Sequence, residues 1–299
     1  MTSHGAAQVA ELHGRELAYS IHGDISHTPF LFVHGIGSTG HAWDPVVQVL
    51  AGQGYGTIAV DLPGHGKSSK ESGDYSLGAL ASLLRDLLDH LHVPTCVLVG
   101  HSLGGGIALQ FAYQFPDRLA ALALVSSGGL GVETSAVLRW TAVPGSGVVM
   151  ATACNKVTIG AMSAVATGLT RLHRPLPTAL RASTLDRLRE IADPDHRNAF
   201  LAILRAVVDQ SGQKFSAMPK LPALADTPTL IVWGTADHIL PLAHGIRAHA
   251  MLPTSTFVVF DGAGHEPHVD DPDRMAHLLA TLADEVLAEQ GVSAGTAAN

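Results

Sequence analysis

Cysteine is scarce in this chain, which has only Cys96 and Cys154 among its 299 residues. The two cysteines are far apart and stand in no metal-binding spacing, which fits a reducing compartment. Residues 1–14 contain neither a basic n-region nor an apolar h-region, so we expect no signal peptide. Together these absences predict a cytoplasmic protein.

Charged residues are also few, at 15% of the chain against 46% hydrophobic residues, which is ample for a large core. Asp and Glu outnumber Lys and Arg by 26 to 18, so the net charge is −8. The basic residues are scattered and offer no positively charged stripe for nucleic acid. We therefore expect no nucleic-acid partner.

A long unbroken apolar run is missing as well. Residues 142–169 are mostly apolar, but glycines, a proline, Asn155 and Lys156 interrupt them. This pattern favours buried helices over a membrane span. We expect no stable membrane insertion.

The chain does contain short, mostly apolar runs that alternate with helical patterns. Residues 76–92 carry leucines at the i, i+3, i+4 and i+7 spacing of an amphipathic helix. The apolar runs do not alternate with polar residues, which is typical of parallel strands covered on both faces. The pattern predicts an α/β fold with a mostly parallel, doubly wound sheet. The runs are residues 29–35, 56–64, 96–100, 119–127, 228–234 and 256–262.

The alternation stops over residues 128–225, which show helical patterns and no clear strands. This stretch is too long for one crossover connection, so we interpret it as a helical lid inserted over the sheet. The predicted catalytic core is then residues 12–127 together with 226–290. Residues 291–299, rich in small residues, are predicted to form a disordered tail.

One short segment raises a chemical question, because Ser102 stands in the sequence Gly-His-Ser-Leu-Gly between an apolar run and a helical pattern. A serine in such a strand-to-helix turn is held in a strained backbone conformation, with its hydroxyl above the carboxyl edge of the sheet. Gly100 and Gly104 leave room for strand and helix to approach closely. A phosphate-binding turn is the alternative, but the segment lacks both G-x-G-x-x-G and Gly-Lys-Ser/Thr.

A serine nucleophile needs a base and an acid that orients the base. Asp237 and His265 each follow an apolar strand pattern, so both should lie at the same sheet edge as Ser102. The order Ser, Asp, His matches the pattern of a nucleophile elbow. Asp261 competes for the acid role, although its short separation from His265 disfavours a well-aimed hydrogen bond, and Asp209 is a weaker rival.

Two further site features can be assessed from the sequence. The oxyanion formed during attack needs two N–H donors, which we assign to the backbone of Leu103, after the nucleophile, and of Ile36, after an early strand. His265 and His268 could suggest a metal site, but no third ligand stands at a fixed spacing, so no metal is expected.

Five segments resemble successive blocks of the α/β-hydrolase fold superfamily, in its serine esterase- and lipase-like branch with a helical lid. They read FVHGIGSTGHAW, VDLPGHGKSS, VGHSLGGGIAL, LIVWGTADHILP and GAGHEPHVDDPDRM. The resemblance implies that Ser102 is the nucleophile, His265 the base and Asp237 the acid, with Ile36 and Leu103 as oxyanion donors. It implies no cofactor.

The resemblance also separates branches of the superfamily. Haloalkane dehalogenases and soluble epoxide hydrolases have an aspartate where Ser102 stands, so the serine favours acyl transfer. Carbon–carbon bond hydrolases keep the serine but usually have Asn at the position of His101. The expected function is therefore hydrolysis of small or medium apolar carboxylic esters through an acyl-enzyme. Carbon–carbon hydrolysis, perhydrolysis and a non-hydrolytic cyclase or binding role remain alternatives.

Overall fold

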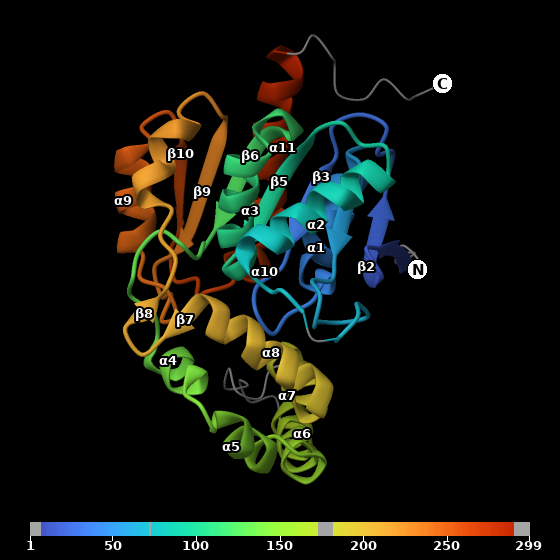
Figure 1. Cartoon of the computed structure of the whole chain (residues 1–299), viewed down its shortest axis with the longest axis vertical. Coiled ribbons are helices and arrows are strands. Elements are labelled where there is room, and N and C mark those ends of the chain that lie inside the picture. Colours follow the sequence, from blue (N-terminus) through green and yellow to red (C-terminus); the bar gives the residue numbers. More distant parts are fainter. Residues whose placement is uncertain (1–6, 72, 173–181, 290–299) are drawn as a thin grey trace.

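The computed structural model describes residues 7–71, 73–172 and 182–289 and centres on an eight-stranded sheet (Figure 1). The strand order is β1-β2-β4-β3-β5-β6-β9-β10. β2 pairs antiparallel with both β1 and β4, and every other neighbouring pair is parallel. The predicted α/β fold with a mostly parallel sheet is confirmed. The strands are β1 (Gln8–Leu12), β2 (Arg15–His22), β3 (Phe30–Val33), β4 (Thr57–Val60), β5 (Cys96–His101), β6 (Leu119–Val125), β9 (Thr229–Gly234) and β10 (Thr256–Phe260).

The central strands are buried along their whole length. Every residue of β3, β4, β5 and β9 is buried, which explains why these runs are apolar at consecutive positions. β1 was not predicted from the sequence, because its alternation of exposed and buried residues at the sheet edge gives a weak signal.

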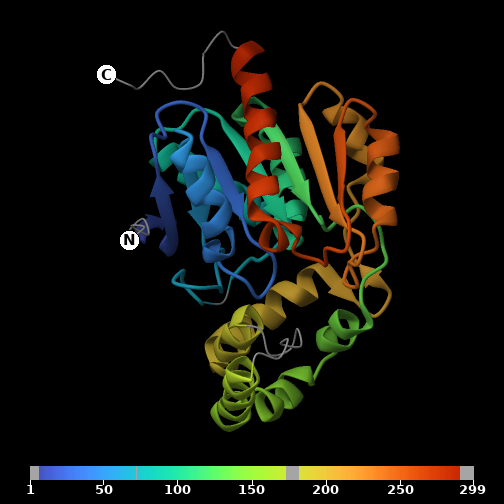
Figure 2. The same cartoon turned by 180° about the vertical axis from the view of Figure 1, so that it is seen from behind.

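Helices cover both faces of the sheet. One face carries α2 (Leu77–His90), α3 (Leu103–Gln114) and α9 (Ala243–Met251), and the other carries α1 (Asp44–Gly52) and α11 (Pro272–Glu289) (Figures 1 and 2). Each layer forms its own apolar core against the sheet. Shorter helical segments are η1 (Gly40–Trp43), η2 (Pro116–Arg118) and α10 (Pro267–Asp270).

The sequence of α2 shows why a helix forms there. Ser76 caps it by accepting a hydrogen bond from the Ala79 backbone N–H at 3.3 Å. Leu80, Leu84 and Leu87 form a buried stripe at helical spacing. Each buried leucine stabilises the fold by roughly 1.5–3 kcal/mol.

Between β6 and β9 the chain leaves the sheet and forms a group of helices below its carboxyl edge (Figure 1). They are α4 (Ala136–Ala142), α5 (Ser146–Ala153), α6 (Lys156–Arg171), α7 (Ala182–Ala192) and α8 (Pro194–Val207), followed by η4 (Met218–Leu224). The sequence pattern shows no clear strands in this stretch, but the structure contains two short ones. β7 (Val208–Asp209) and β8 (Gly212–Gln213) form a short antiparallel hairpin. Two residues per strand are too few to produce an alternating pattern.

Two further expectations concern residues that lie outside the described ranges. The predicted tail 291–299 lies outside them, as does the start of the helical pattern that becomes α7. Among the residues described, no single helix is both long and apolar enough to cross a membrane. α5 and α6 pass that test only as a pair, with a bend of 51° between them.

Candidate active site

Ser102 occupies the junction between β5 and α3 in a strained backbone conformation. Its φ of 53° and ψ of −112° lie outside the regions that non-glycine residues ordinarily populate. Such strain persists only where the surrounding structure enforces it, and it concentrates at functional sites. The sequence prediction of a tight strand-to-helix turn at Ser102 is confirmed.

The glycines around this turn are required by close backbone approach. A Cβ at Gly100 would lie 2.3 Å from the backbone oxygen of Gly104, and a Cβ at Gly104 would lie 2.3 Å from that of Val33. A Cβ at Gly35 would lie 3.1 Å from the Cβ of Ser102. Glycine therefore allows β3, β5 and α3 to meet at one point beside the serine.

Ser102, His265 and Asp237 form a continuous hydrogen-bonded chain. His265 follows β10, and its Nδ1 donates to Asp237 Oδ2 at 2.8 Å. With that proton on Nδ1, Nε2 of the neutral ring accepts from the Ser102 hydroxyl at 3.0 Å. Both distances are those of well-formed hydrogen bonds. The structure thus brings together the three residues that the sequence singled out.

The environment of Asp237 shows why this carboxylate meets the histidine. The side chain is fully buried, and its second oxygen, Oδ1, accepts the backbone N–H groups of Ile239 at 2.8 Å and Leu240 at 3.0 Å. These bonds satisfy the buried charge and fix its orientation.

The competing carboxylates lie elsewhere. Asp261 is exposed and accepts from the Thr235 hydroxyl at 3.2 Å, although it follows the same strand as His265. Asp209 lies in the β7–β8 hairpin and accepts from the Ser211 backbone N–H at 2.7 Å. Of the three candidate acids, Asp237 is the one bonded to His265.

Ile36 and Leu103, the expected oxyanion donors, line the same pocket as Ser102. Leu103 is the first residue of α3, so its backbone N–H has no acceptor within the helix. The helix end also contributes a positive dipole next to the serine. Both residues therefore border the pocket that a substrate at Ser102 would occupy.

A layer of buried histidines lies beside this site, and the sequence analysis did not identify it. His101 donates from Nε2 to the backbone carbonyl of His265 at 2.9 Å. The His268 ring packs between Trp43 and His101, at centroid distances of 4.1 and 4.6 Å. Burial holds the pKa values of His101 and His268 well below the ordinary histidine value, so both rings are neutral.

His34 and His65 extend this layer. Burial lowers the pKa of His34 to about 4 and that of His65 to about 3. Each ring accepts one backbone N–H, from Leu62 and from Gly37. His34 and His65 follow β3 and β4, and His101 ends β5. This shared position at strand ends is the signal by which the sequence could have predicted the layer.

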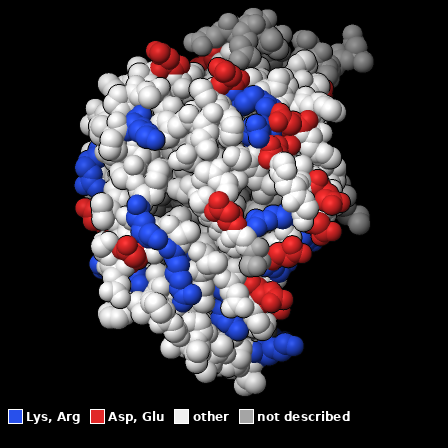
Figure 3. Space-filling model, viewed as in Figure 1, with Lys and Arg blue, Asp and Glu red and all other residues white. Residues whose placement is uncertain are grey.

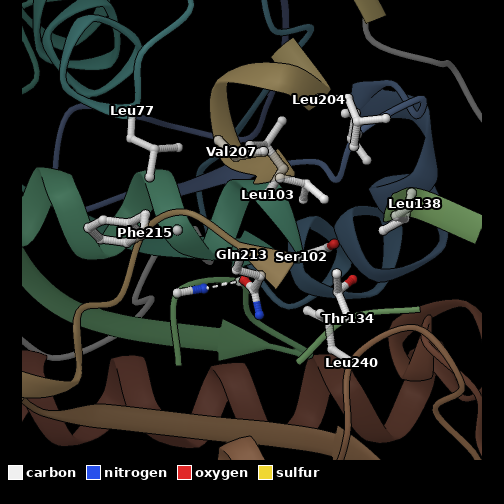
Figure 4. A pocket seen from close by; sticks show the side chains of 15 residues that line it. Leu77, Ser102, Leu103, Thr134, Leu138, Leu204, Val207, Gln213, Phe215 and Leu240 are labelled. Atoms are coloured by element: carbon white, nitrogen blue, oxygen red, sulfur yellow. Dashed lines mark hydrogen bonds between the residues drawn. The ribbon is translucent and has the colours of Figure 1, made fainter. Parts of the chain in front are cut away.

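The pocket at Ser102 is apolar (Figure 4). The inserted segment contributes a large part of its wall, through α4, α8 and the β7–β8 region. Gln213 is held in place because its Oε1 accepts the Gly129 backbone N–H at 2.8 Å. The pocket suits an apolar group with few polar contacts. Its apolar side chains are those of Ile36, Leu77, Leu103, Leu138, Leu204, Val207, Val208, Phe215 and Leu240.

No group of three or more His, Cys, Asp or Glu side chains within the described ranges is arranged to hold a metal ion. His265 and His268, the pair considered from the sequence, have different surroundings. His265 bonds to Ser102 and Asp237, whereas His268 packs against aromatic rings.

Comparisons with known proteins place the chain among related sequences and structures. A sequence model described as alpha/beta hydrolase fold matches residues 28–272. An uncharacterised protein of Mycobacterium tuberculosis is 38% identical, with 93% of this chain and 81% of that protein covered. A 2-hydroxy-6-oxononadienedioate/2-hydroxy-6-oxononatrienedioate hydrolase of Paraburkholderia phymatum is 28% identical, with coverages of 83% and 84%.

Among solved structures, a thermophilic esterase from Thermogutta terrifontis superimposes with a TM-score of 0.71. It is 25% identical in sequence, and the match covers 94% of this chain and 98% of the esterase.

Proposed function

The chain belongs to the alpha/beta hydrolase fold family and is a hydrolase, and we propose that it cleaves carboxylic esters of small or medium apolar substrates. The observation that carries this proposal is the hydrogen-bonded chain from Ser102 through His265 to Asp237 at the wall of an apolar pocket. Similarity to an esterase over nearly the whole length adds support.

The first half of the proposed reaction forms an acyl-enzyme. Ser102 Oγ attacks the ester carbonyl carbon while His265 Nε2 takes the hydroxyl proton. The carbonyl oxygen becomes an oxyanion that accepts hydrogen bonds from the backbone N–H groups of Ile36 and Leu103. The tetrahedral intermediate then collapses, the C–O bond to the alcohol breaks, and His265 gives its proton to the departing alkoxide.

The second half releases the acid. Water gives a proton to His265 Nε2 and adds to the acyl carbon, and the bond to Ser102 Oγ breaks as the proton returns to that oxygen. Asp237 stays ionised and stabilises the His265 imidazolium in both halves. We further propose that α4–α8 act as a lid, because side chains from this segment line the same pocket as Ser102.

The test is a panel of p-nitrophenyl esters of increasing acyl length with wild type and Ser102→Ala. We expect a burst of p-nitrophenol equal to the enzyme concentration, and kcat/KM should rise about fourfold per buried methylene until the pocket is full. A fluorophosphonate should label Ser102 with loss of fluoride. Ester turnover no faster than that of Ser102→Ala would contradict the proposal, as would labelling at another residue.

Carbon–carbon bond hydrolysis is the second candidate, favoured by the similarity to the Paraburkholderia hydrolase. A vinylogous diketone in the same panel separates the two functions. Preference for that diketone over every ester would support the second candidate. Hydrogen peroxide added to the ester assay tests perhydrolysis, which would yield a peracid. A protein with a non-hydrolytic role would turn over none of these substrates.

A further inference from the structure

The helices α4, α5 and α6 present apolar side chains to solvent. Within the described part of the chain, twelve large hydrophobic side chains are exposed, and six of them lie on these three helices. Trp140 is 74% exposed and Val157 is 80% exposed. Exposed apolar side chains gathered at one end of a molecule mark an interaction site. The six residues, here called the valine face, are Val137, Trp140, Val148, Val149, Val157 and Val165.

The exposure reverses the usual arrangement of a surface helix, in which the apolar stripe is buried and the opposite face is polar. α5 has the sequence SGVVMATA, yet none of its residues is buried. α6 buries only Ile159 and Ala166, and its exposed side carries Val157, Val165 and several small residues. The expectation that residues 142–169 form buried helices is therefore wrong for α5 and for most of α6, and packing against the rest of the protein does not explain their composition.

Charge distinguishes this region from the remainder of the chain. Over the described residues 134–172, which include α4, α5 and α6, there are three Lys or Arg and no Asp or Glu, although the whole chain has a net charge of −8. Lys156 begins α6, Arg171 ends it, and both are exposed. In Figure 3 the lowest end of the molecule, where α5 and α6 lie, is white and blue. The surface thus combines apolar side chains with positive charge.

We propose that the valine face docks on the surface of a membrane that contains anionic lipids. Trp140 and the valines would enter the boundary between headgroups and acyl chains, while Lys156 and Arg171 would contact lipid phosphates. A second copy of the chain fits less well, because a twofold contact would bring the basic residues of α6 in the two copies together. This proposal does not depend on the reaction assigned to Ser102.

Trp140 provides a direct probe of binding. The other two tryptophans, Trp43 and Trp233, are fully buried, so a change in fluorescence on adding vesicles reports on Trp140. We expect a blue shift with phosphatidylcholine vesicles containing 30% phosphatidylglycerol, and a much smaller one with phosphatidylcholine alone. Salt at 0.5 M should weaken binding. Trp140→Phe should abolish the fluorescence signal while the protein still sediments with the vesicles.

Substitutions then locate the surface. The double variant Val148→Glu with Val149→Glu should lower vesicle affinity at least tenfold. Ile246→Glu is the matched control, because Ile246 is 51% exposed on α9, outside the valine face, and this variant should bind like wild type. Lys156→Gln and Arg171→Gln should each weaken binding about fivefold. Circular dichroism verifies that every variant is folded.

Several results would overturn the proposal. One is absence of binding to anionic vesicles, and another is equal binding to anionic and neutral vesicles. A third is equal loss of binding in Ile246→Glu and in the double valine variant. Sedimentation velocity without vesicles tests the remaining alternative, in which a second copy of the chain covers the valine face. Self-association of wild type that the double valine variant abolishes would assign the face to a second copy instead.

Discussion

At the scale of single residues, the backbone geometry of Ser102, the proposed nucleophile, depends on neighbouring glycines, which have no side chain. The positive φ of Ser102 is costly for a residue with a Cβ. The close contacts of Gly100 and Gly104 with surrounding backbone hold the turn in place. These glycines therefore contribute to the site because they have no Cβ atom. Substituting one of them by alanine tests whether the close backbone approach requires glycine.

Gly104→Ala should destabilise the protein by more than about 2 kcal/mol, because the new Cβ would meet the Val33 backbone oxygen and force α3 away from β3. Gly160→Ala is the matched control. A Cβ at Gly160 in α6 meets nothing within 4 Å, so alanine there should stabilise the helix by about 0.5–1 kcal/mol. Urea unfolding measures both. Equal effects of the two substitutions would contradict the close-approach argument.

The choice of acid is a second question at the scale of single residues. Asp237→Asn should lower kcat by on the order of 10⁴, because an amide stabilises the wrong tautomer of His265. Asp261→Asn should change kcat little, since Asp261 is exposed and bonds to Thr235. Ester turnover of the two variants decides between them. A crippled Asp261→Asn enzyme beside an active Asp237→Asn enzyme would refute the assignment.

At the scale of elements, arginines connect the inserted helices to one another and to the rest of the chain. Arg205 of α8 donates to the carbonyls of Ala142 at 3.1 Å and Val143 at 3.2 Å, and so binds the end of α4. Arg187 of α7 forms an ion pair with Glu266, the residue directly after His265. The second contact joins the insertion to the segment that carries the proposed base.

A double-mutant cycle measures the strength of this link. Arg187→Ala, Glu266→Ala and the double variant should give a coupling energy of about 0.2–1 kcal/mol in unfolding experiments, since both side chains are partly exposed. Salt at 1 M should reduce that coupling by screening. A coupling near zero at low salt would show that the ion pair does not hold α7, and a salt-independent coupling would show that charge is not its cause.

At the scale of the whole molecule, the buried histidines link stability to pH. His34 accepts the Leu62 N–H and His65 accepts the Gly37 N–H, at 2.9 and 3.0 Å. Protonation would break these bonds and place a charge in the core. Burial accordingly lowers the pKa of His34 to about 4 and that of His65 to about 3.

The direction of the pH effect follows from proton binding. An unfolded histidine takes up a proton below about pH 6.5, while the folded protein keeps both rings neutral until about pH 4. The stability is therefore complete above pH 6.5 and is lost as the pH falls toward 4. Each histidine should contribute a loss of about 1.4 kcal/mol per pH unit in this window.

Urea unfolding between pH 7.5 and 5 checks this expectation. Relative to wild type, His65→Asn should show a shallower pH dependence. His92→Asn is the control, because His92 is exposed and its positive φ is one that asparagine tolerates. Constant stability across the range would contradict the argument. So would an identical slope in wild type and His65→Asn.

Much of the fold could be predicted from the sequence because its signals are local. The apolar runs of β3, β5 and β9 and the leucine spacing of α2 each reflect burial of that segment alone. The hairpin of β7 and β8 was missed because two-residue strands carry no period. β1 was missed because an edge strand buries few residues.

By itself, the sequence determined the strand-to-helix turn at Ser102 and the chain order of Ser102, Asp237 and His265. Both could be predicted because turns and strand ends depend on residues that are adjacent in the sequence. The sequence already favoured Asp237 over Asp261 as the partner of His265, but only the tertiary structure shows the hydrogen bond between them, since that bond depends on how β9 and β10 align at the sheet edge. It alone gathered His34, His65, His101 and His268 into one buried layer. It alone also left the valine face exposed on apolar helices, because burial depends on which surfaces meet in three dimensions.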